Sequence, residues 1–321
     1  MAPAGAASDG GYDYASDVSA HRLVVLDVCD VNELLDAEPI DFAAVDVVYR
    51  EGGNSVNADG SVRTLAGFAT AEDRLHGLAE YYDTPTPLDD YVTAAIEGTG
   101  AFEGTSDAVR RQGVQKGIQN QVMVAWVVHE LNSALAKADD GDFGAAEGAP
   151  HNWDEAWAFY HGAESGCAPY NTANSRAENF GTTGADGETG LTNEAILAAM
   201  MAGRDALVDG DAQGAQDAAD EVIRNLVITY SQAAIRYATL VAEDVSAGDT
   251  EAAAEHQAEG LAFFRVIEPA VAGAGADVDA VNAVFDLSAP GQNGDGDTVR
   301  QALQPAWESV GITPEDIGQL G

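Results

Sequence analysis

Two segments of the chain repeat one pattern of carboxylates among aromatic residues. Glu155 and Glu164 in the first segment correspond, at one constant interval, to Glu259 and Glu268 in the second. Carboxylates from facing helices are how helical bundles hold iron or manganese. The repeat therefore predicts two related helices that bring glutamates to one pseudo-symmetric metal site. The alternative is that the repeated glutamates pair with arginines or with helix ends.

Two histidines could add nitrogen ligands to such a site. His151 precedes Glu155 by four residues, which places both side chains on one face of a helix. An imidazole and a carboxylate at this spacing can ligate one iron, manganese or zinc ion. His129, which lies beside Glu130 in a long apolar segment, is a second candidate. The alternatives are that His151 caps its helix and that His129 is a core residue.

Glu164 follows Glu155 by about two and a half helical turns, so a straight helix would point the two carboxylates apart. Gly162 indicates that the helix ends before Glu164. The aromatic residues of this segment cover all of its faces, which predicts a central, buried helix. Tyr160 is among them and could ligate ferric iron, but core packing is its expected use.

The elements that would position these residues are predicted to be helices, since no series of alternating strands occurs. We expect an all-α helical bundle built from two pseudo-repeated units, about 94–164 and 199–268, within a single domain over 21–321. Residues 1–20 are predicted to be a disordered tail. Residues 22–28 are apolar and branched enough for a strand, after which Asp30 would cap a helix. The other expected helices cover 41–49, 70–82, 85–97, 106–138, 153–162, 193–208, 211–247 with one break, 250–267 stopped by Pro269, 276–287 and 297–310.

The segment 165–190 is rich in Gly, Thr and Asn and is predicted to be a long loop. Loops of this length in compact domains are usually functional. The acidic clusters that begin at Asp139 and Asp209 do not match the twelve-residue calcium loop. Cys29 and Cys167 allow one disulfide, or a buried free pair.

The charge of the chain limits its partners. It carries 54 acidic against 14 basic residues, a net charge of −40, in 321 residues of which 46% are hydrophobic. Such a chain can bury a core, and its acidic surface is typical of a protein from a high-salt organism. Nucleic acids and anionic membranes need basic patches, so neither is an expected partner. No run approaches the roughly 20 apolar residues of a membrane-inserted helix.

No sequence motif of a common enzyme class is present. A nucleophile elbow, a P-loop, a dinucleotide fingerprint, a zinc-protease helix and a paired CxxC are all missing. We therefore expect a binding protein rather than an enzyme. No secretory signal is visible, and the small, polar opening residues suggest a mature tail behind a removed signal.

Four segments together resemble a known family, the algal iron-assimilating, high-CO2-inducible periplasmic proteins and their microbial relatives. The segments are Tyr49-Arg-Glu-Gly-Gly-Asn-Ser-Val with Gly60-Ser-Val-Arg-Thr-Leu, His151-Asn-Trp-Asp-Glu-Ala-Trp-Ala-Phe-Tyr-His-Gly, Tyr170-Asn-Thr-Ala-Asn-Ser-Arg-Ala-Glu-Asn-Phe-Gly-Thr and Ala258-Glu-Gly-Leu-Ala-Phe-Phe-Arg-Val-Ile-Glu-Pro. The resemblance spans about residues 45–270. It implies a secreted or cell-surface protein that binds iron and helps to assimilate it, without a known reaction. The motif positions that it marks are Asn54, Arg63, Asp154, Glu155, Tyr160, Arg176, Glu178, Asn179 and Glu259.

Three functional hypotheses follow. The first is an extracellular iron-binding protein with a carboxylate-rich site between the repeats, which hands its metal to a cell-surface transport partner. Its proposed metal ligands are His129, His151, Glu155, Glu164, Glu259 and Glu268, with iron as the expected metal and other divalent metals left open. The second is a di-metal carboxylate oxidase such as a ferroxidase, which usually needs Glu-x-x-His pairs that are missing from the repeated helices. The third is a non-metal module that binds a ligand or partner and uses the repeat only as structure.

Overall fold

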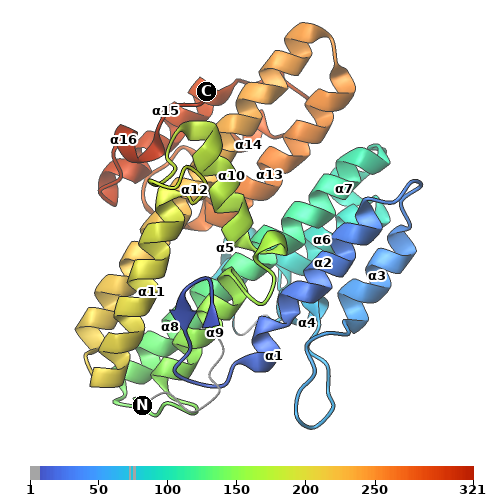
Figure 1. The fold of residues 1–321 in the computed structure, drawn as a ribbon. Coiled ribbons are helices and arrows are strands. Elements are labelled where there is room, and N and C mark those ends of the chain that lie inside the picture. Colours follow the sequence, from blue (N-terminus) through green and yellow to red (C-terminus); the bar gives the residue numbers. More distant parts are fainter. Residues whose placement is uncertain (1–7, 72–73, 75–76) are drawn as a thin grey trace.

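The computed structural model describes residues 8–71, 74 and 77–321, and the regular structure of this part is helical apart from one two-stranded sheet (Figure 1). The helices are α1 (Ser19–Arg22), α2 (Val24–Leu35), α3 (Phe42–Glu51), α4 (Leu65–Ala69), α5 (Leu78–Tyr82), α6 (Pro87–Glu97), the 3-10 helix η2 (Gly100–Phe102), α7 (Asp107–Lys116), the π-helix η3 (Gly117–Val122), α8 (Met123–Asp139), α9 (Ala149–Tyr160), the 3-10 helix η4 (Ser165–Cys167), α10 (Pro169–Phe180), α11 (Leu191–Asp209), α12 (Ala212–Ala247), α13 (Thr250–Gly273), α14 (Val278–Val284), α15 (Gly296–Ser309) and α16 (Pro314–Ile317). The predicted all-α fold is confirmed.

Glu155 and Glu259 of the sequence repeat lie on α9 and α13. α9 packs against α8, and α13 packs against α12. In Figure 1 the first pair lies in the lower half of the molecule and α13 lies in the upper half. The helix expected over 106–138 is confirmed as α7, η3 and α8 in sequence, and the Ser106 hydroxyl caps it by accepting from the Val109 amide.

The N-terminal segment differs from its prediction. The tail was predicted to be disordered through residue 20, but Ser8–Asp9 and Tyr12–Asp13 pair as the antiparallel strands β1 and β2. The side chain of Tyr12 is fully buried, and its hydroxyl donates to Asp154 Oδ1 at 2.7 Å. The small, polar composition gave no sign of these long-range contacts with α9, which Ser16 and the Asp9 carbonyl also make. The prediction for residues 1–7 lies outside the described residues.

Several helix boundaries also need correction. Residues 22–28 form no strand, since α2 begins at Val24 and buries its branched apolar residues on one helical face, and Asp30 lies inside that helix. The expected loop 165–190 contains the helix α10. The helix expected over 70–82 is replaced by α4 and α5, and residues 72, 73, 75 and 76 of that range lie outside the described residues.

Two long helices continue where a break or stop was expected. α12 runs unbroken from Ala212 to Ala247 because most of its central residues are buried against neighbouring helices. α13 continues through Pro269 to Gly273. Proline removes one backbone donor inside a helix. The carbonyl of Arg265, which that donor would have satisfied, accepts a hydrogen bond from the Tyr82 hydroxyl at 3.5 Å.

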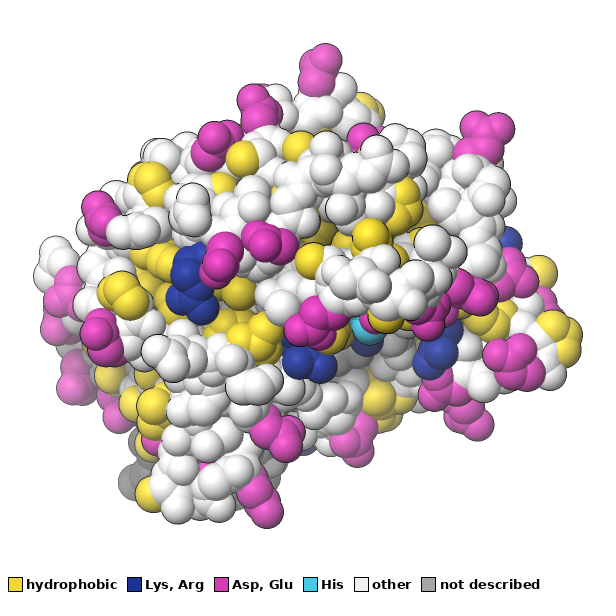
Figure 2. Space-filling view, turned by 90° about the horizontal axis from the view of Figure 1, so that it is seen from above, with side chains coloured by type: hydrophobic (Ala, Val, Ile, Leu, Met, Phe, Trp, Pro, Cys, Tyr) yellow, Lys and Arg dark blue, Asp and Glu magenta, His cyan; other side chains and the backbone are white. Residues whose placement is uncertain are grey.

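A disulfide fixes the first helices to the rest of the bundle. Cys29 in α2 is bonded to Cys167 in η4, with the two Cα atoms 5.3 Å apart. This settles the alternative that the sequence left open. Among the described residues, no helix combines the length and the apolar run that a membrane span requires. On the face in Figure 2, acidic side chains are widely scattered, and Lys, Arg and His side chains lie around a hollow.

Candidate metal centre

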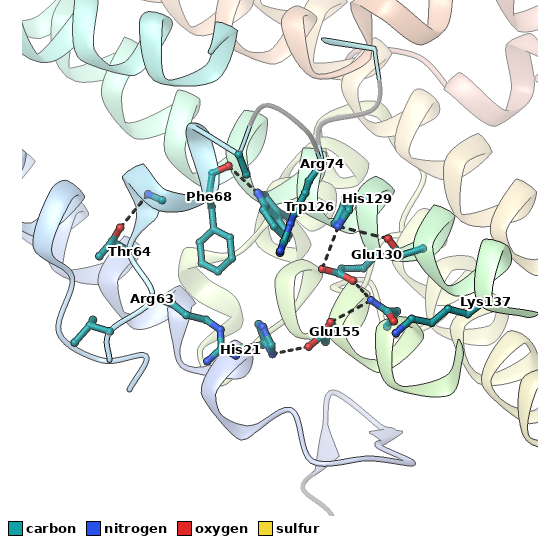
Figure 3. A pocket seen from close by; sticks show the side chains of 15 residues that line it. His21, Arg63, Thr64, Phe68, Arg74, Trp126, His129, Glu130, Lys137 and Glu155 are labelled. Atoms are coloured by element: carbon teal, nitrogen blue, oxygen red, sulfur yellow. Dashed lines mark hydrogen bonds and ion pairs between the residues drawn. The ribbon is translucent and has the colours of Figure 1, made fainter. Parts of the chain in front are cut away.

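A cavity of about 630 Å³ opens between α4, α8 and α9 (Figure 3). Two aromatic residues form its apolar wall: Trp126 packs edge-on against Phe68 and donates its indole hydrogen to the Phe68 carbonyl. The described lining residues are His21, Val62, Arg63, Thr64, Gly67, Phe68, Ala71, Arg74, Trp126, His129, Glu130, Ser133, Lys137, Asn152 and Glu155.

Two imidazole rings converge on one carboxylate oxygen at the edge of this cavity. His21 Nδ1 lies 2.9 Å and His151 Nε2 lies 3.1 Å from Glu155 Oε1. His151 and Glu155 lie on one face of α9, as their spacing predicted. His21, from the short helix α1, was missed by the sequence analysis, which placed it at the edge of a disordered tail. No spacing signal links residue 21 to residue 155.

A second carboxylate, Glu130 from α8, lies beside the first. Asn152 Nδ2 donates to Glu130 Oε2 at 2.5 Å and lies 3.4 Å from Glu155 Oε2. His129 Nε2 lies 3.9 Å from Glu130 Oε1. Two of the predicted ligands, His129 on α8 and Glu155 on α9, thus belong to one cluster. Glu130 and Asn152, which were not predicted, lie between them.

The two carboxyl groups differ in their affinity for protons. Burial raises the pKa of Glu130 to about 8, and the negative charge of Glu155 adds to the rise. Burial would also raise the pKa of Glu155, but the hydrogen bonds from His151 and His21 outweigh it and hold that pKa well below its usual range. The hydrogen bond to Glu155 in turn raises the pKa of His151. Near neutral pH the site therefore holds one charged and one protonated carboxyl group, as coupled carboxylate pairs do.

Positive side chains line the same cavity. Arg63, Arg74 and Lys137 are three of only 14 Lys and Arg residues in a chain with 54 acidic ones. Figure 3 shows Arg74 above the carboxylates and Lys137 beside them. Because positive side chains are so scarce in this chain, their presence here favours a ligand that carries negative charge of its own.

The other repeated glutamates lie in different surroundings. Glu259 is not among the described lining residues of the cavity: its Oε1 lies 3.6 Å from Lys116 Nζ and accepts from the Tyr237 hydroxyl at 3.1 Å. Glu268 accepts from Tyr82 at 2.8 Å and from Asn282 at 2.7 Å. Among the described residues, no hydrogen bond or ion pair joins the surroundings of Glu259 or Glu268 to those of Glu155.

Glu164 lies outside α9, which ends at Tyr160, as Gly162 predicted. Its exposed carboxylate caps η4 by accepting from the Gly166 amide at 3.2 Å. A helix-end role was one of the alternatives for the repeated glutamates, and Glu164 fills it.

Most motif positions from the family resemblance have structural contacts. Asn54 donates to Asp27 and Asp30, and Asp154 accepts from the Ser16 hydroxyl and amide. Tyr160 donates to Asn193, which is the core role expected for it. The guanidinium of Arg176 lies 5.4 Å from the centre of the Tyr237 ring, and the backbone carbonyl of Asn179 accepts from the Gly321 amide. Glu178 is exposed, and Arg63 lines the cavity.

Within the part of the chain that the structure describes, no group of three or more His, Cys, Asp and Glu side chains is arranged so that it could hold a metal ion. The donors around Glu155 are engaged with one another through hydrogen bonds instead. The geometry defines a buried, charge-compensated acid–base cluster at the edge of an open cavity.

A disulfide such as Cys29–Cys167 is typical of proteins that work outside the cytoplasm. The chain belongs to the family described as low iron-inducible periplasmic proteins, which it matches over residues 2–318. The resemblance seen in the sequence is thereby confirmed. The description of the family supports a role in iron assimilation and a location outside the cytoplasm. No curated protein and no solved structure matches the chain.

Proposed function

We propose that this protein captures iron outside the cytoplasm and that the cavity beside Glu155 receives it. The observation that carries the proposal is the convergence of His21 Nδ1 and His151 Nε2 on a single buried Glu155 oxygen. Two imidazoles and one carboxylate are a donor set that proteins use for non-haem iron. Calcium and magnesium prefer oxygen ligands, so the nitrogen donors would select against them.

Iron would have to displace the hydrogen bonds that now join these donors. Ligands must be deprotonated to bind a metal, and the binding therefore releases protons. Glu130 holds a proton near neutral pH, because burial raises its pKa to about 8. Its ionisation on iron binding would supply a second carboxylate beside Glu155 and offset the positive charge of the metal.

The cavity suits an iron complex better than a bare ion. Its volume of about 630 Å³ is far more than one metal ion needs, and Arg63, Arg74 and Lys137 line it. We infer that iron enters together with a small anionic chelator, whose negative groups these side chains neutralise. An iron complex held this way could later be passed to a transport partner at the cell surface.

A dinuclear oxidase is less well supported. Such sites need about four carboxylates. The described lining of the cavity contains two, Glu130 and Glu155.

The test is an iron titration of protein purified in high salt, with ferric citrate as the source and excess calcium and magnesium present. We expect about one iron per chain to survive the competition. The double variant R63Q/K137Q should weaken binding of ferric citrate, whereas R50Q, an arginine paired with Asp46 on the surface, should not. Displacement of all iron by the hard cations would contradict the proposal, because it would assign the binding to the general acidic surface.

A further inference from the structure

A second cavity, of about 310 Å³, lies on the opposite side of α8 from the candidate metal centre. Ala125, Val128 and Asn132 of α8 face this second cavity, whereas Trp126, His129 and Ser133 face the first. Its walls come from α5, α6, η3, α8 and α13. They are mainly apolar and comprise Leu78, Leu88, Val124, Ala125, Val128, Val266, Pro269 and Ala270.

One end of this cavity carries a positive charge. The guanidinium of Arg265 lies 4.1 Å from the centre of the Tyr82 ring and 5.0 Å from that of Tyr91. Its Nε donates to Gln121 Oε1 at 3.3 Å. Arg265 forms no ion pair with any described carboxylate. This arginine on the cavity wall is held only by rings and neutral groups, in a chain of net charge −40.

One acidic group close to this end is Glu268, whose charge acts on Tyr82 together with that of Arg265. Both oxygens of Glu268 are engaged, one by the Tyr82 hydroxyl at 2.8 Å and the other by Asn282 at 2.7 Å. Glu268 is not among the described lining residues of the cavity. The positive charge of Arg265 is therefore available to an occupant of the cavity.

A buried amide completes the polar end. Gln121 is 3% exposed, and its buried Nε2 has no hydrogen-bond partner among the described residues. Gln121 belongs to the π-helix η3, and π-helical turns inside α-helices are frequent at functional sites. A buried donor without a partner is costly, so an acceptor supplied by a ligand would stabilise it.

We propose that this cavity binds a small amphipathic monocarboxylate. The carboxylate would accept from Arg265 and Gln121, and the hydrocarbon tail would lie against α8 and α13. A polar end made of donors calls for an acceptor, and the positive charge favours an anionic one. The apolar walls favour a tail rather than a second charged group. This site is independent of the iron proposal, since the two cavities share none of their described lining residues.

The test is calorimetric titration of the full chain, in high salt, with octanoate as the probe and with 1-octanol and octylammonium as matched controls. We expect saturable binding of one octanoate per chain, at least tenfold weaker binding of octanol, and none of octylammonium. Affinity should rise about fourfold for each methylene added from hexanoate to octanoate. Absence of saturable octanoate binding, or equal binding of octanol, would overturn the proposal.

Variants locate the binding. R265Q removes the positive charge. A125F fills the cavity from α8 and retains Arg265. If one of these variants fails to fold, the other still tests the proposal. Each should weaken octanoate binding at least tenfold. R50Q is the matched control, because Arg50 also lies over a tyrosine ring, at 5.8 Å, away from the cavity. Unchanged binding in either folded variant would overturn the assignment of the carboxylate or of the tail to this cavity.

Discussion

Glu130 and Glu155, from two neighbouring helices, share a single amide donor: Asn152 Nδ2 lies 2.5 Å from Glu130 Oε2 and 3.4 Å from Glu155 Oε2. The two carboxyl groups are therefore coupled, but their other partners differ. His21 and His151 hold Glu155 in its charged form, whereas burial and the nearby negative charge keep a proton on Glu130. The proposed site has one ligand ready to bind and one that must first ionise.

The variant E130Q should become more stable relative to the parent as pH rises. The pKa of Glu130 in the folded protein, about 8, exceeds its ordinary value of 4.5, so the folded state prefers the neutral carboxyl group. The parent therefore loses stability as pH rises from about 4.5 to about 8, and the neutral Gln does not share this loss. The relative gain between pH 5 and pH 9 should exceed about 1 kcal/mol, since one pKa unit corresponds to about 1.4 kcal/mol.

Guanidinium unfolding of both proteins at the two pH values measures this gain. The exposed Glu103 offers a control, and E103Q should show no such trend. The same stability difference between E130Q and the parent at both pH values would show that Glu130 is ionised throughout.

Removal of the disulfide should destabilise the protein strongly. Cys29 and Cys167 are separated by 138 residues, and a cross-link over so long a loop restricts the unfolded chain. The double variant C29S/C167S should lose roughly 3–5 kcal/mol of unfolding free energy, measured by denaturant titration. A reducing agent should produce a similar loss in the parent and none in the double variant. A parent that is insensitive to reduction would show that the bond adds little.

Salt should stabilise the fold. A net charge of −40 makes the folded surface repel itself, and added salt shortens the range of this repulsion from about 10 Å at 0.1 M to about 3 Å at 1 M. The melting temperature measured by circular dichroism should therefore rise as KCl is increased over this range. A constant or falling melting temperature would mean that the acidic side chains are already well spaced.

The helical fold was predictable because its signals are local. Ser106 and Asp41 cap the two helices that were expected to begin at these residues. His151 contacts Glu155 because four residues make about one helical turn. The rest of the site depends on packing between elements far apart in sequence. His21 reaches Glu155 from a short helix near the N-terminus, and no periodicity encodes that contact.

The repeat illustrates the same limit. Glu155 and Glu259 correspond in the sequence repeat, which predicted one role for both, and they lie on α9 and α13. Their neighbours come from outside the repeat or from positions where the two copies differ. Histidines surround Glu155, whereas Lys116 and Tyr237 contact Glu259. Two glutamates that correspond in the sequence repeat therefore have different hydrogen-bond and ion-pair partners.

The most direct test of the central claim compares iron binding by the single variants E155Q and E259Q. Each variant replaces the carboxylate of one repeated glutamate with an amide. Bound iron per chain would be measured with calcium and magnesium in excess. We predict that E155Q binds iron at least about 100-fold more weakly than the parent, while E259Q keeps the parent's affinity and stoichiometry. Retention of tight iron binding by E155Q, or an equal loss in E259Q, would contradict the assignment of iron to the cavity beside Glu155.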